Sequence, residues 1–187
     1  MKNLKKIVAA VLVSVMAFSL AGCSFGKVTA VSMKDFKKAV KAVGDDDVED
    51  SYYEIDEDEI EDWYSSYEKD DIIGVAGATD YDDLGFDYYQ FEDADAAADY
   101  FEDLYDDFQD VKDDDDFDGK YKCSLGKSQG FIIFDGELDD TDFGDDFMIG
   151  GIYWADDMII TCYCTSDKKK DVEKYNAFID ALGYPSI

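Results

Sequence analysis

The sequence predicts an α+β domain, in which three or four helices pack mainly on one face of an antiparallel sheet of about four to six strands. Three apolar segments, at residues 131–134, 147–154 and 158–164, are short, rich in β-branched and aromatic residues and bounded by Asp or Gly. This pattern is typical of buried strands. The linker at residues 155–157 is too short for a crossover helix, so the last two segments should form an antiparallel hairpin. Amphipathic helical segments elsewhere in the chain supply partners for this sheet.

The composition indicates one folded, strongly acidic domain. Of the 187 residues, 47% are hydrophobic and 16% are aromatic, which is enough to fill a core. The formal net charge at pH 7 is −30, from 17 basic and 47 acidic residues. A field of this sign repels DNA, RNA and anionic lipid, so we expect no nucleic-acid partner.

Two basic side-chain types are missing from the chain. It has no His, and all 17 of its basic residues are Lys. Imidazole is the usual near-neutral general base and the commonest metal ligand, and the guanidinium group is the bidentate clamp for phosphate and carboxylate. Their absence favours a protein that is not an enzyme, although catalysis by carboxylates alone stays open.

The first 22 residues have the pattern of a signal peptide. Lys2, Lys5 and Lys6 form a charged start, and residues 7–18 form an apolar run of the length found in signal peptides. This run is shorter than the ~20 apolar residues that a membrane-spanning helix needs. We therefore expect residues 1–22 to be removed. Because they contain three lysines and no acids, removal leaves 14 Lys against 47 acids, a formal net charge of −33.

The end of this segment, Leu20-Ala21-Gly22-Cys23, resembles the lipobox of bacterial lipoproteins. In that family the sulfur of the Cys is alkylated by diacylglycerol and the chain is cut just before it. The resemblance therefore implies lipidation of Cys23. Two alternatives are cleavage by an ordinary signal peptidase after Ser19-Leu20-Ala21 and retention of the segment as an uncleaved anchor.

The resemblance also implies a location and a partner. Two or more acyl chains, at about 0.8 kcal/mol per buried CH₂, would hold the protein on the extracytoplasmic face of the cell membrane, with the lipid bilayer as partner. Residues 23–31 would be a flexible tether and residues 32–187 a single acidic domain. This part is similar to small acidic lipoproteins, mostly without assigned function, of low-GC Gram-positive bacteria. The similarity lies in the lipobox, the Asp and Lys bias and the segment at residues 134–140.

The domain is expected to begin with a helix over residues 33–43. Residues 32–35 fit a capping box, and apolar residues then recur at helical spacing. These apolar residues are Phe36, Val40 and Val43. Gly44 can end the helix in a left-handed conformation. Residues 45–50 are a run of charge without periodicity, which predicts a solvated loop.

A second helix is expected over residues 56–69, where one side is apolar and the other acidic. Its apolar positions are Ile60, Trp63, Tyr64 and Tyr67. Residues 72–79 have strand character, although Gly74 and Gly77 weaken this prediction. Residues 86–91 also have the composition of a strand.

The clearest helical pattern covers residues 93–111. Apolar residues recur there at spacings of three and four, and acids fill the other side. The apolar positions are Ala97, Phe101, Leu104, Phe108 and Val111, and the acidic ones are Asp95, Asp99, Glu102, Asp103, Asp106 and Asp110. The apolar stripe must be buried, so we expect this helix to pack on the sheet.

Two more elements complete the domain. Residues 120–125 alternate between polar and apolar, which predicts a strand with one wet face. After the strand that closes at Cys164, a helix should follow that ends at Gly183 and Pro185. The apolar positions of this helix are Val172, Tyr175, Ile179 and Leu182.

An aspartate-rich segment matches the first half of an EF-hand calcium loop. Asp114, Asp116 and Asp118 occupy positions one, three and five, and Gly119 occupies position six. Position twelve should be a bidentate acid, but it is Leu125. A calcium ion would lack its strongest protein contact, so a solvated acidic turn is the simpler interpretation.

A second acidic segment, at residues 135–146, contains five further aspartates. They are Asp139, Asp140, Asp142, Asp145 and Asp146. Hard cations take several oxygen ligands, so this segment could bind a divalent cation. The simpler interpretation is a loop that keeps the neighbouring apolar strands from aggregating.

Three cysteines remain if Cys23 is lipidated. Cys162 and Cys164 are two residues apart on an expected strand, so they should point to the same face of the sheet. An extracytoplasmic location permits a disulfide between Cys123 and one of these two. We favour free thiols packed as small apolar groups, because no cationic neighbour would activate them.

Residues 168–170 are three consecutive lysines at the expected start of the last helix. The helix dipole disfavours positive charge at this end. The lysines could bind an anionic partner, or they could pair with carboxylates near them.

These patterns favour a non-enzymatic binding or interaction module that is anchored outside the cytoplasm. One alternative is a calcium-binding protein, and another is a protein that sequesters cationic peptides through its acidic helix faces. A hydrolase that uses carboxylates alone is the alternative from the enzyme class. It requires acids from distant segments to converge in one apolar-walled cleft.

Overall fold

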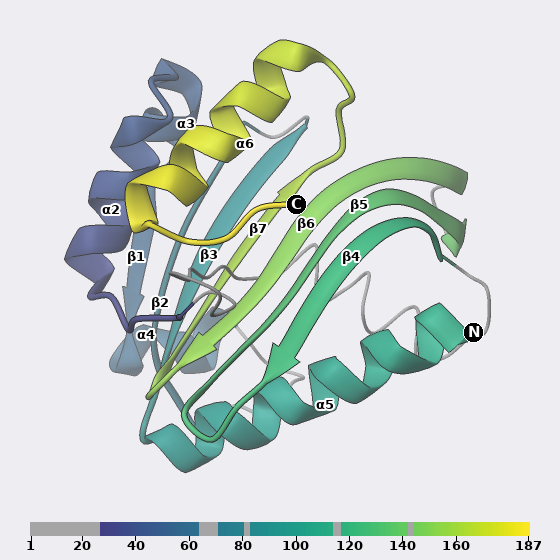
Figure 1. The fold of residues 1–187 in the computed structure, drawn as a ribbon. Coiled ribbons are helices and arrows are strands. Elements are labelled where there is room, and N and C mark those ends of the chain that lie inside the picture. Colours follow the sequence, from purple (N-terminus) through teal and green to yellow (C-terminus); the bar gives the residue numbers. More distant parts are fainter. Residues whose placement is uncertain (1–26, 64–70, 81–82, 114–116, 142–143) are drawn as a thin grey trace.

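The computed structural model describes residues 27–63, 71–80, 83–113, 117–141 and 144–187 (Figure 1). Within these residues the chain forms one seven-stranded antiparallel sheet, in the order β1-β2-β3-β7-β6-β5-β4, and five helices. The predicted α+β class is confirmed. The strands are β1 (Tyr53–Asp56), β2 (Ile72–Thr79), β3 (Leu84–Phe91), β4 (Phe117–Leu125), β5 (Gln129–Thr141), β6 (Gly144–Ala155) and β7 (Met158–Cys164). The helices are α2 (Met33–Ala42), α3 (Asp46–Asp50), α4 (Glu57–Trp63), α5 (Ala94–Asp113) and α6 (Lys169–Leu182).

Two short elements differ from the expectation. The sheet has seven strands rather than four to six, because β1 adds an edge strand of four residues, which is too short to show alternation. The acidic run at residues 45–50 was expected to be a loop but contains α3. Asp45 caps this helix by accepting hydrogen bonds from the backbone N–H groups of Asp47 (3.1 Å) and Val48 (3.4 Å). Val48 alone is buried in α3, so the sequence carries no periodicity to detect.

Helices cover both faces of the sheet, which corrects the expectation that they lie mainly on one (Figure 1). On one face, Phe178 of α6 packs on Phe86 of β3 with ring centroids 4.3 Å apart, and α2 lies beside α6. On the other, Phe101 of α5 stacks on Trp154 of β6 at 5.6 Å. We call these the α6 face and the α5 face. The central strands are apolar on both sides, so each side needs a cover.

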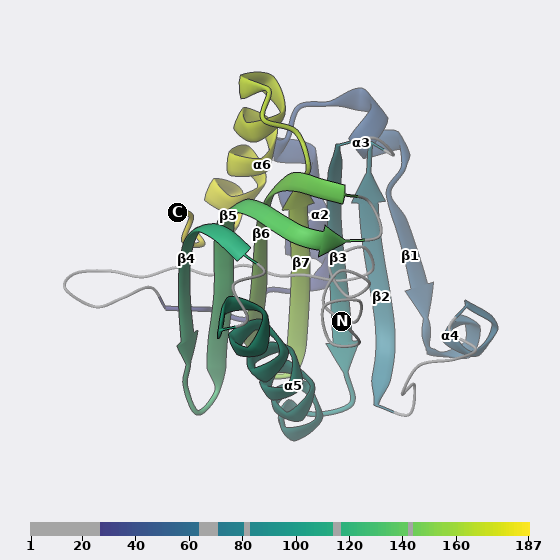
Figure 2. The same cartoon turned by 90° about the vertical axis from the view of Figure 1, so that its right-hand side faces the viewer.

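The α5 face is covered by α5 and by parts of the sheet itself (Figure 2). α5 crosses it diagonally, and the far ends of the long strands β5 and β6 curve across it. The predicted stripe of α5 is confirmed, because each of its members is at most 6% exposed. They are Ala97, Phe101, Leu104, Phe108 and Val111.

Several predicted boundaries are also confirmed. Ala155 pairs with Met158, so β6 and β7 form the expected hairpin with a two-residue turn. The side chain of Ser32 caps α2 by accepting a hydrogen bond from Asp35 N at 3.2 Å. Gly183 ends α6 with a φ of 72°, a left-handed conformation that favours glycine. Of the predicted helix at residues 56–69, the structure describes α4, in which Ile60 is buried, and residues 64–69 lie outside the described part.

The segment before α2 is bound to the domain rather than free. Val28 is 3% exposed, and its N–H donates to Gln129 Oε1 at 2.7 Å. The hydroxyl of Tyr184 donates to the carbonyl oxygen of Thr29 at 3.0 Å, and that of Tyr88 to the carbonyl oxygen of Val31 at 3.2 Å. Residues 28–31, which were expected to belong to a flexible tether at residues 23–31, are therefore part of the folded domain.

The predicted leader lies outside the described residues, as does Cys23 with its lipobox. Among the helices that are described, none combines the length and the apolar character that crossing a membrane requires.

Candidate functional site

The segment that resembles half of an EF-hand is largely a strand. Asp114 and Asp116 lie outside the described residues, whereas Asp118 and Gly119 belong to β4 and pair with Glu137 and Gly136 of β5. Leu125 also lies in β4. Positions four to twelve of the motif are therefore extended, which differs from the compact loop of an EF-hand. In the described part of the chain, no three acidic or Cys side chains are grouped so that they could hold a metal ion.

The second acidic segment, at residues 135–146, spans the hairpin between β5 and β6. Asp135 accepts a hydrogen bond from Lys120 Nζ at 2.9 Å, so this acid is neutralised across β4 and β5. The side chains of residues 138–146, with the five other aspartates, lie outside the described part. Cation binding by them stays a prediction.

The three described cysteines are free thiols and lie on opposite faces of the sheet. Cys123 is on the α5 face, where its thiol donates to Tyr105 OH of α5 at 3.7 Å. Cys162 is on the α6 face, where its thiol donates to Tyr175 OH of α6 at 3.6 Å. Cys164 follows two residues later and shares that face. The sheet separates the thiols, which rules out the alternative of a disulfide between Cys123 and Cys162 or Cys164 and agrees with the favoured prediction of free thiols.

Burial makes two of these thiols unreactive. Cys162 and Cys164 are both 0% exposed. Burial raises the pKa of Cys164 to about 11, and it raises the pKa of Cys162 well above the ordinary range. Neither forms a thiolate at neutral pH, so both act as small apolar groups in the core.

Two of the three lysines at residues 168–170 pair with carboxylates. Lys168 Nζ lies 2.9 Å from Asp83 Oδ2, and Lys169 Nζ lies 2.6 Å from Glu173 Oε1. These lysines are exposed, so the pairs contribute little to stability.

A charged cluster that the sequence did not reveal surrounds Lys174 of α6. Its Nζ lies 3.0 Å from Asp45, 3.3 Å from Asp171 and 4.0 Å from Asp80. All four side chains are between 10% and 14% exposed. We call these residues the Lys174 cluster. It joins the cap of α3, the end of β2 and the first turn of α6, and its lysine lowers the pKa of Asp45.

A second polar group lies on the α5 face. Tyr53, Gly77, Asp87 and Thr161 are successive cross-strand partners on β1, β2, β3 and β7, and we call them the polar row. Asp87 Oδ1 accepts a hydrogen bond from Tyr53 OH at 3.2 Å, and Oδ2 accepts one from Thr161 Oγ1 at 3.1 Å. A Cβ at Gly77 would lie 2.5 Å from Tyr53 OH and 2.6 Å from Asp87 Oδ1. Glycine therefore lets the two side chains meet.

The carboxylate of the polar row has no cationic partner in the described part of the chain. Burial raises the pKa of Asp87 to about 7, although the hydroxyls of Thr161 and Tyr53 stabilise its charged form. The sequence contained a signal for this residue, because Asp87 interrupts the aromatic strand at residues 86–91. Alternation places it on the same side as Tyr89 and Phe91, which are both buried.

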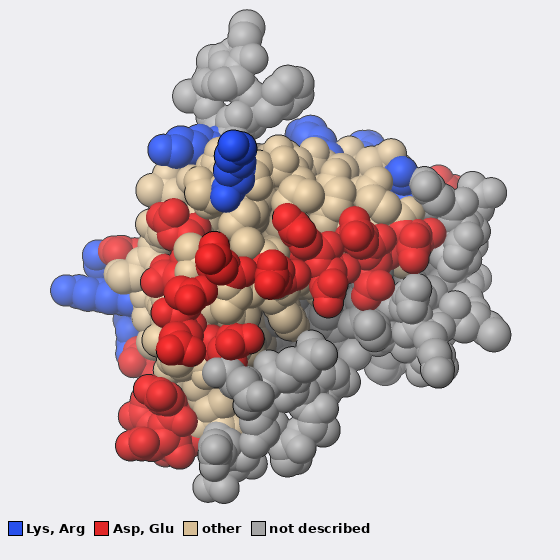
Figure 3. Space-filling model, turned by 90° about the horizontal axis from the view of Figure 1, so that it is seen from below, with Lys and Arg blue, Asp and Glu red and all other residues tan. Residues whose placement is uncertain are grey.

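Exposed carboxylates line the outer side of α5 (Figure 3). Asp95, Asp99, Glu102, Asp103 and Asp106 form what we call the α5 acidic face. Within the residues that the structure describes, none of these five forms an ion pair. Acids elsewhere, such as Asp83 and Asp135, are paired with lysines.

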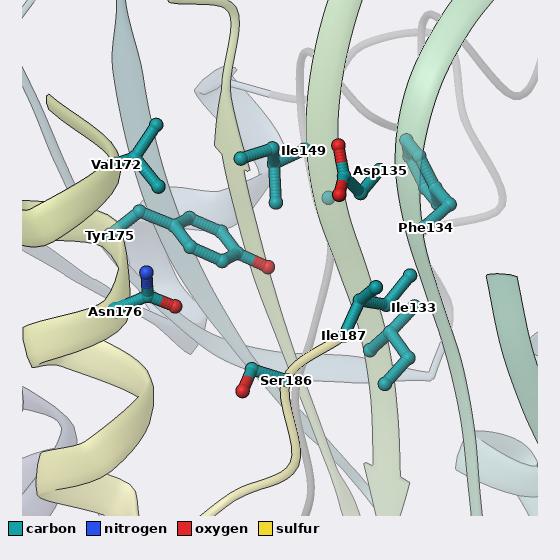
Figure 4. Close-up of a pocket in the computed structure, with 10 residues that line it drawn as sticks. Ile133, Phe134, Asp135, Ile149, Val172, Tyr175, Asn176, Ser186 and Ile187 are labelled. Atoms are coloured by element: carbon teal, nitrogen blue, oxygen red, sulfur yellow. The ribbon is translucent and has the colours of Figure 1, made fainter. Parts of the chain in front are cut away.

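A small pocket of about 100 Å³ lies between α6, the C-terminal tail and the α6-face side of β5 and β6 (Figure 4). Its polar lining includes Asp135, Tyr175, Asn176 and Ser186. Asp135 is bound to Lys120, and Tyr175 OH accepts from Cys162. The pocket has room for a few water molecules, and two of its polar groups are already engaged.

Comparison with known proteins gives no relative: no family model, curated protein or solved structure matches this chain.

Proposed function

We propose that this chain is a lipid-anchored, extracytoplasmic binding protein without catalytic activity, and that it binds cationic ligands. The observation that carries the proposal is the α5 acidic face, where Asp99, Glu102 and Asp103 are exposed and have no described cationic partner. A dense set of uncompensated carboxylates attracts cations and accelerates their association.

The N-terminal part of the proposal rests on the lipobox. Cys23 is the residue that would carry the acyl chains, and the folded domain begins shortly after it, at Val28. Mass spectrometry of the protein from its native membrane tests this part. We expect a diacylglyceryl mass on an N-terminal Cys23, and an unmodified Cys23 behind an intact leader would contradict it.

The enzyme alternative finds no support in the described residues. A carboxylate hydrolase needs acids from distant segments to converge without being neutralised. Asp45, Asp80 and Asp171 do converge, but Lys174 lies among them. We expect no turnover of ester, glycoside or peptide substrates.

Binding of a cationic peptide tests the ligand class. We would titrate the full chain in a non-ionic detergent with an octalysine peptide at several salt concentrations. We expect saturable binding that weakens steeply with salt, because the charges are exposed. Neutralising Asp99, Asp103 and Asp106 together, each to Asn, should weaken it at least tenfold.

A matched control removes the same number of charges elsewhere. Asp56, Asp167 and Asp180 are exposed and lie outside α5, and changing all three to Asn alters the net charge equally. This variant should bind octalysine within about twofold of the unchanged protein. Equal losses in both variants, or binding that is independent of salt, would contradict a role for the α5 acidic face.

A further inference from the structure

We propose that the polar row is a binding site for the ammonium group of a small organic cation, with Asp87 as the residue that contacts it. This inference rests on the proposed function and names a specific site for it on the sheet itself. Tyr53, Asp87 and the neighbouring Tyr163 are partly exposed, whereas Thr161 is buried. The row is therefore a half-buried polar strip on an otherwise largely apolar sheet face.

The hydrogen bonds leave Asp87 able to accept more donors. A carboxylate offers about four lone-pair positions. Tyr53 and Thr161 use one on each oxygen and fix the orientation of the group. An ammonium group supplies up to three N–H donors and a positive charge, so it can bind the remaining positions by charge-assisted hydrogen bonds.

Aromatic rings beside the carboxylate also suit an organic cation. The ring of Tyr53 lies against Gly77, and that of Tyr163 lies against Gly85 of β3. Tyr163 is the cross-strand partner of Gly85, so it is the diagonal neighbour of Asp87 on the same face of the sheet. Tyrosine ring faces attract cations within about 6 Å of their centroids.

Other classes of ligand fit the row less well. A hard metal ion takes six or more oxygen ligands, and here a single carboxylate is present with two hydroxyls that donate to it. An anion would be repelled both by Asp87 and by the net charge of −30. A neutral ligand would leave the carboxylate without a counter-charge, which low-dielectric surroundings disfavour.

The comparison with the Lys174 cluster supports the same conclusion. In that cluster a lysine of this chain lies among the carboxylates, at 3.0 Å from Asp45. On the polar row the corresponding cation is missing from the described part of the chain. A bound ammonium group would complete the row in the same way that Lys174 completes the cluster.

The experiment titrates the full chain, in a non-ionic detergent at pH 8, with n-butylammonium chloride. NMR of carboxyl-labelled aspartate follows the Asp87 signal, with 1-butanol as the uncharged probe and NaCl as the ionic-strength control. We expect saturable binding of n-butylammonium and a downward shift of the Asp87 titration midpoint by at least one pH unit when it is bound. 1-Butanol should produce neither effect.

Two variants with the same chemical change localise the binding. Asp87→Asn removes the charge, keeps the shape and should weaken n-butylammonium binding at least tenfold. Asp56→Asn removes an exposed carboxylate from β1 on the α6 face and should change it less than twofold. Binding that survives Asp87→Asn, or no saturable binding to the unchanged protein, would overturn the inference.

The octalysine titration separates this result from the proposed function. If octalysine binding depends on α5 while n-butylammonium does not bind, the polar row is not an ammonium site and the α5 acidic face keeps its role. If n-butylammonium binds through Asp87 and octalysine does not bind, the row is a site for small cations and the peptide role of α5 is wrong. If neither binds, both proposals fail.

Discussion

The Lys174 cluster and the polar row both hold carboxylates that are largely removed from solvent, but different groups stabilise these carboxylates. In the cluster, Lys174 lies between Asp45 and Asp171, and Asp171 also accepts a hydrogen bond from Ser166 Oγ at 3.0 Å. In the polar row, Asp87 accepts hydrogen bonds from two hydroxyls, those of Tyr53 and Thr161. The first arrangement compensates charge, and the second orients a charge that stays uncompensated.

The difference indicates what each region is for. A paired and hydrogen-bonded charge fastens elements together, and the cluster joins α3, the end of β2 and α6. An unpaired carboxylate with a raised pKa opposes folding at neutral pH, and groups of this kind concentrate at functional sites. Removing the charge of Lys174 and removing the charge of Asp87 should therefore change stability in opposite directions.

The largest expected effect is in the Lys174 cluster. Lys174→Met should lower the free energy of unfolding by about 3 kcal/mol, because it removes the cation that three close and largely buried carboxylates share. Urea denaturation at pH 7 measures this. Lys169→Met on the same helix removes an exposed lysine and should leave the urea midpoint unchanged. Similar midpoints for the two variants would show that the cluster does not hold the elements together.

The cluster also predicts a response to acid. Lys174 and local hydrogen bonds lower the pKa of Asp45, and Ser166 and Lys174 outweigh burial to lower that of Asp171. Their stabilisation is present above the ordinary pKa of 3.8 and is lost as the pH falls through the lowered values. In Lys174→Met, the free energy of unfolding should therefore fall less steeply as the pH is lowered through this range.

The second-largest expected change in the free energy of unfolding is an increase, and it comes from a variant of the polar row. Asp87→Asn should raise the free energy of unfolding at pH 8 by about 2 kcal/mol, because the amide carries no charge to desolvate. With a folded pKa of about 7 against an ordinary 3.8, Asp87 holds a proton that the unfolded chain has lost. Stability should therefore decline as the pH rises from about 4 to 7.

Urea denaturation across this pH range measures the slope. The net negative charge of the chain also contributes to a decline with pH, so the informative quantity is the difference between Asp87→Asn and the control Asp56→Asn. Asp87→Asn should reduce the slope and Asp56→Asn should not. If stability changes with pH in the same way in both variants, the ionisation of Asp87 does not destabilise the fold.

A smaller effect tests the geometry of the row. Gly77→Ala should lower the free energy of unfolding by about 1 kcal/mol, because its Cβ would displace Tyr53 or Asp87. Gly74→Ala lies on the same strand, where a Cβ would meet Met33 at an ordinary 3.4 Å. That control should be neutral or slightly stabilising. A neutral Gly77→Ala would contradict the close contact.

The smallest effect concerns one donor. Tyr53→Phe removes a hydroxyl that stabilises the charged form of Asp87, so the pKa of Asp87 should rise further. At pH 8 we expect a loss of about 0.5 kcal/mol. NMR titration of the Asp87 carboxyl group measures the change in pKa, and a midpoint that does not rise would show that the Tyr53 hydrogen bond is unimportant.

Periodicity along the chain predicted what depends on neighbours in sequence. The buried stripe of α5, the hairpin of β6 and β7 and the end of α6 at Gly183 all follow from local spacing and turn chemistry. The five-residue α3 and the four-residue β1 were missed, since elements this short contain no full period.

The candidate sites depend on contacts between distant segments, which spacing does not encode. Asp45 and Lys174 are far apart in the sequence but 3.0 Å apart in space. Asp87 meets Thr161 because β7 pairs with β3, a pairing that skips three intervening strands. The strand registers put Cys123 and Cys162 on opposite faces, so the possible disulfide between them does not form and the thiols are free, as favoured.

The docking of Val28 against Gln129 limits how far the fold can move from its anchor. If Cys23 is acylated, as we propose, the chain from that residue to Val28 has five Cα–Cα steps and reaches at most about 18 Å. This distance is of the order of two screening lengths at physiological ionic strength. Anionic headgroups enrich cations within that layer. The short linker would therefore keep the acidic domain next to the membrane surface, where its proposed cationic ligands accumulate.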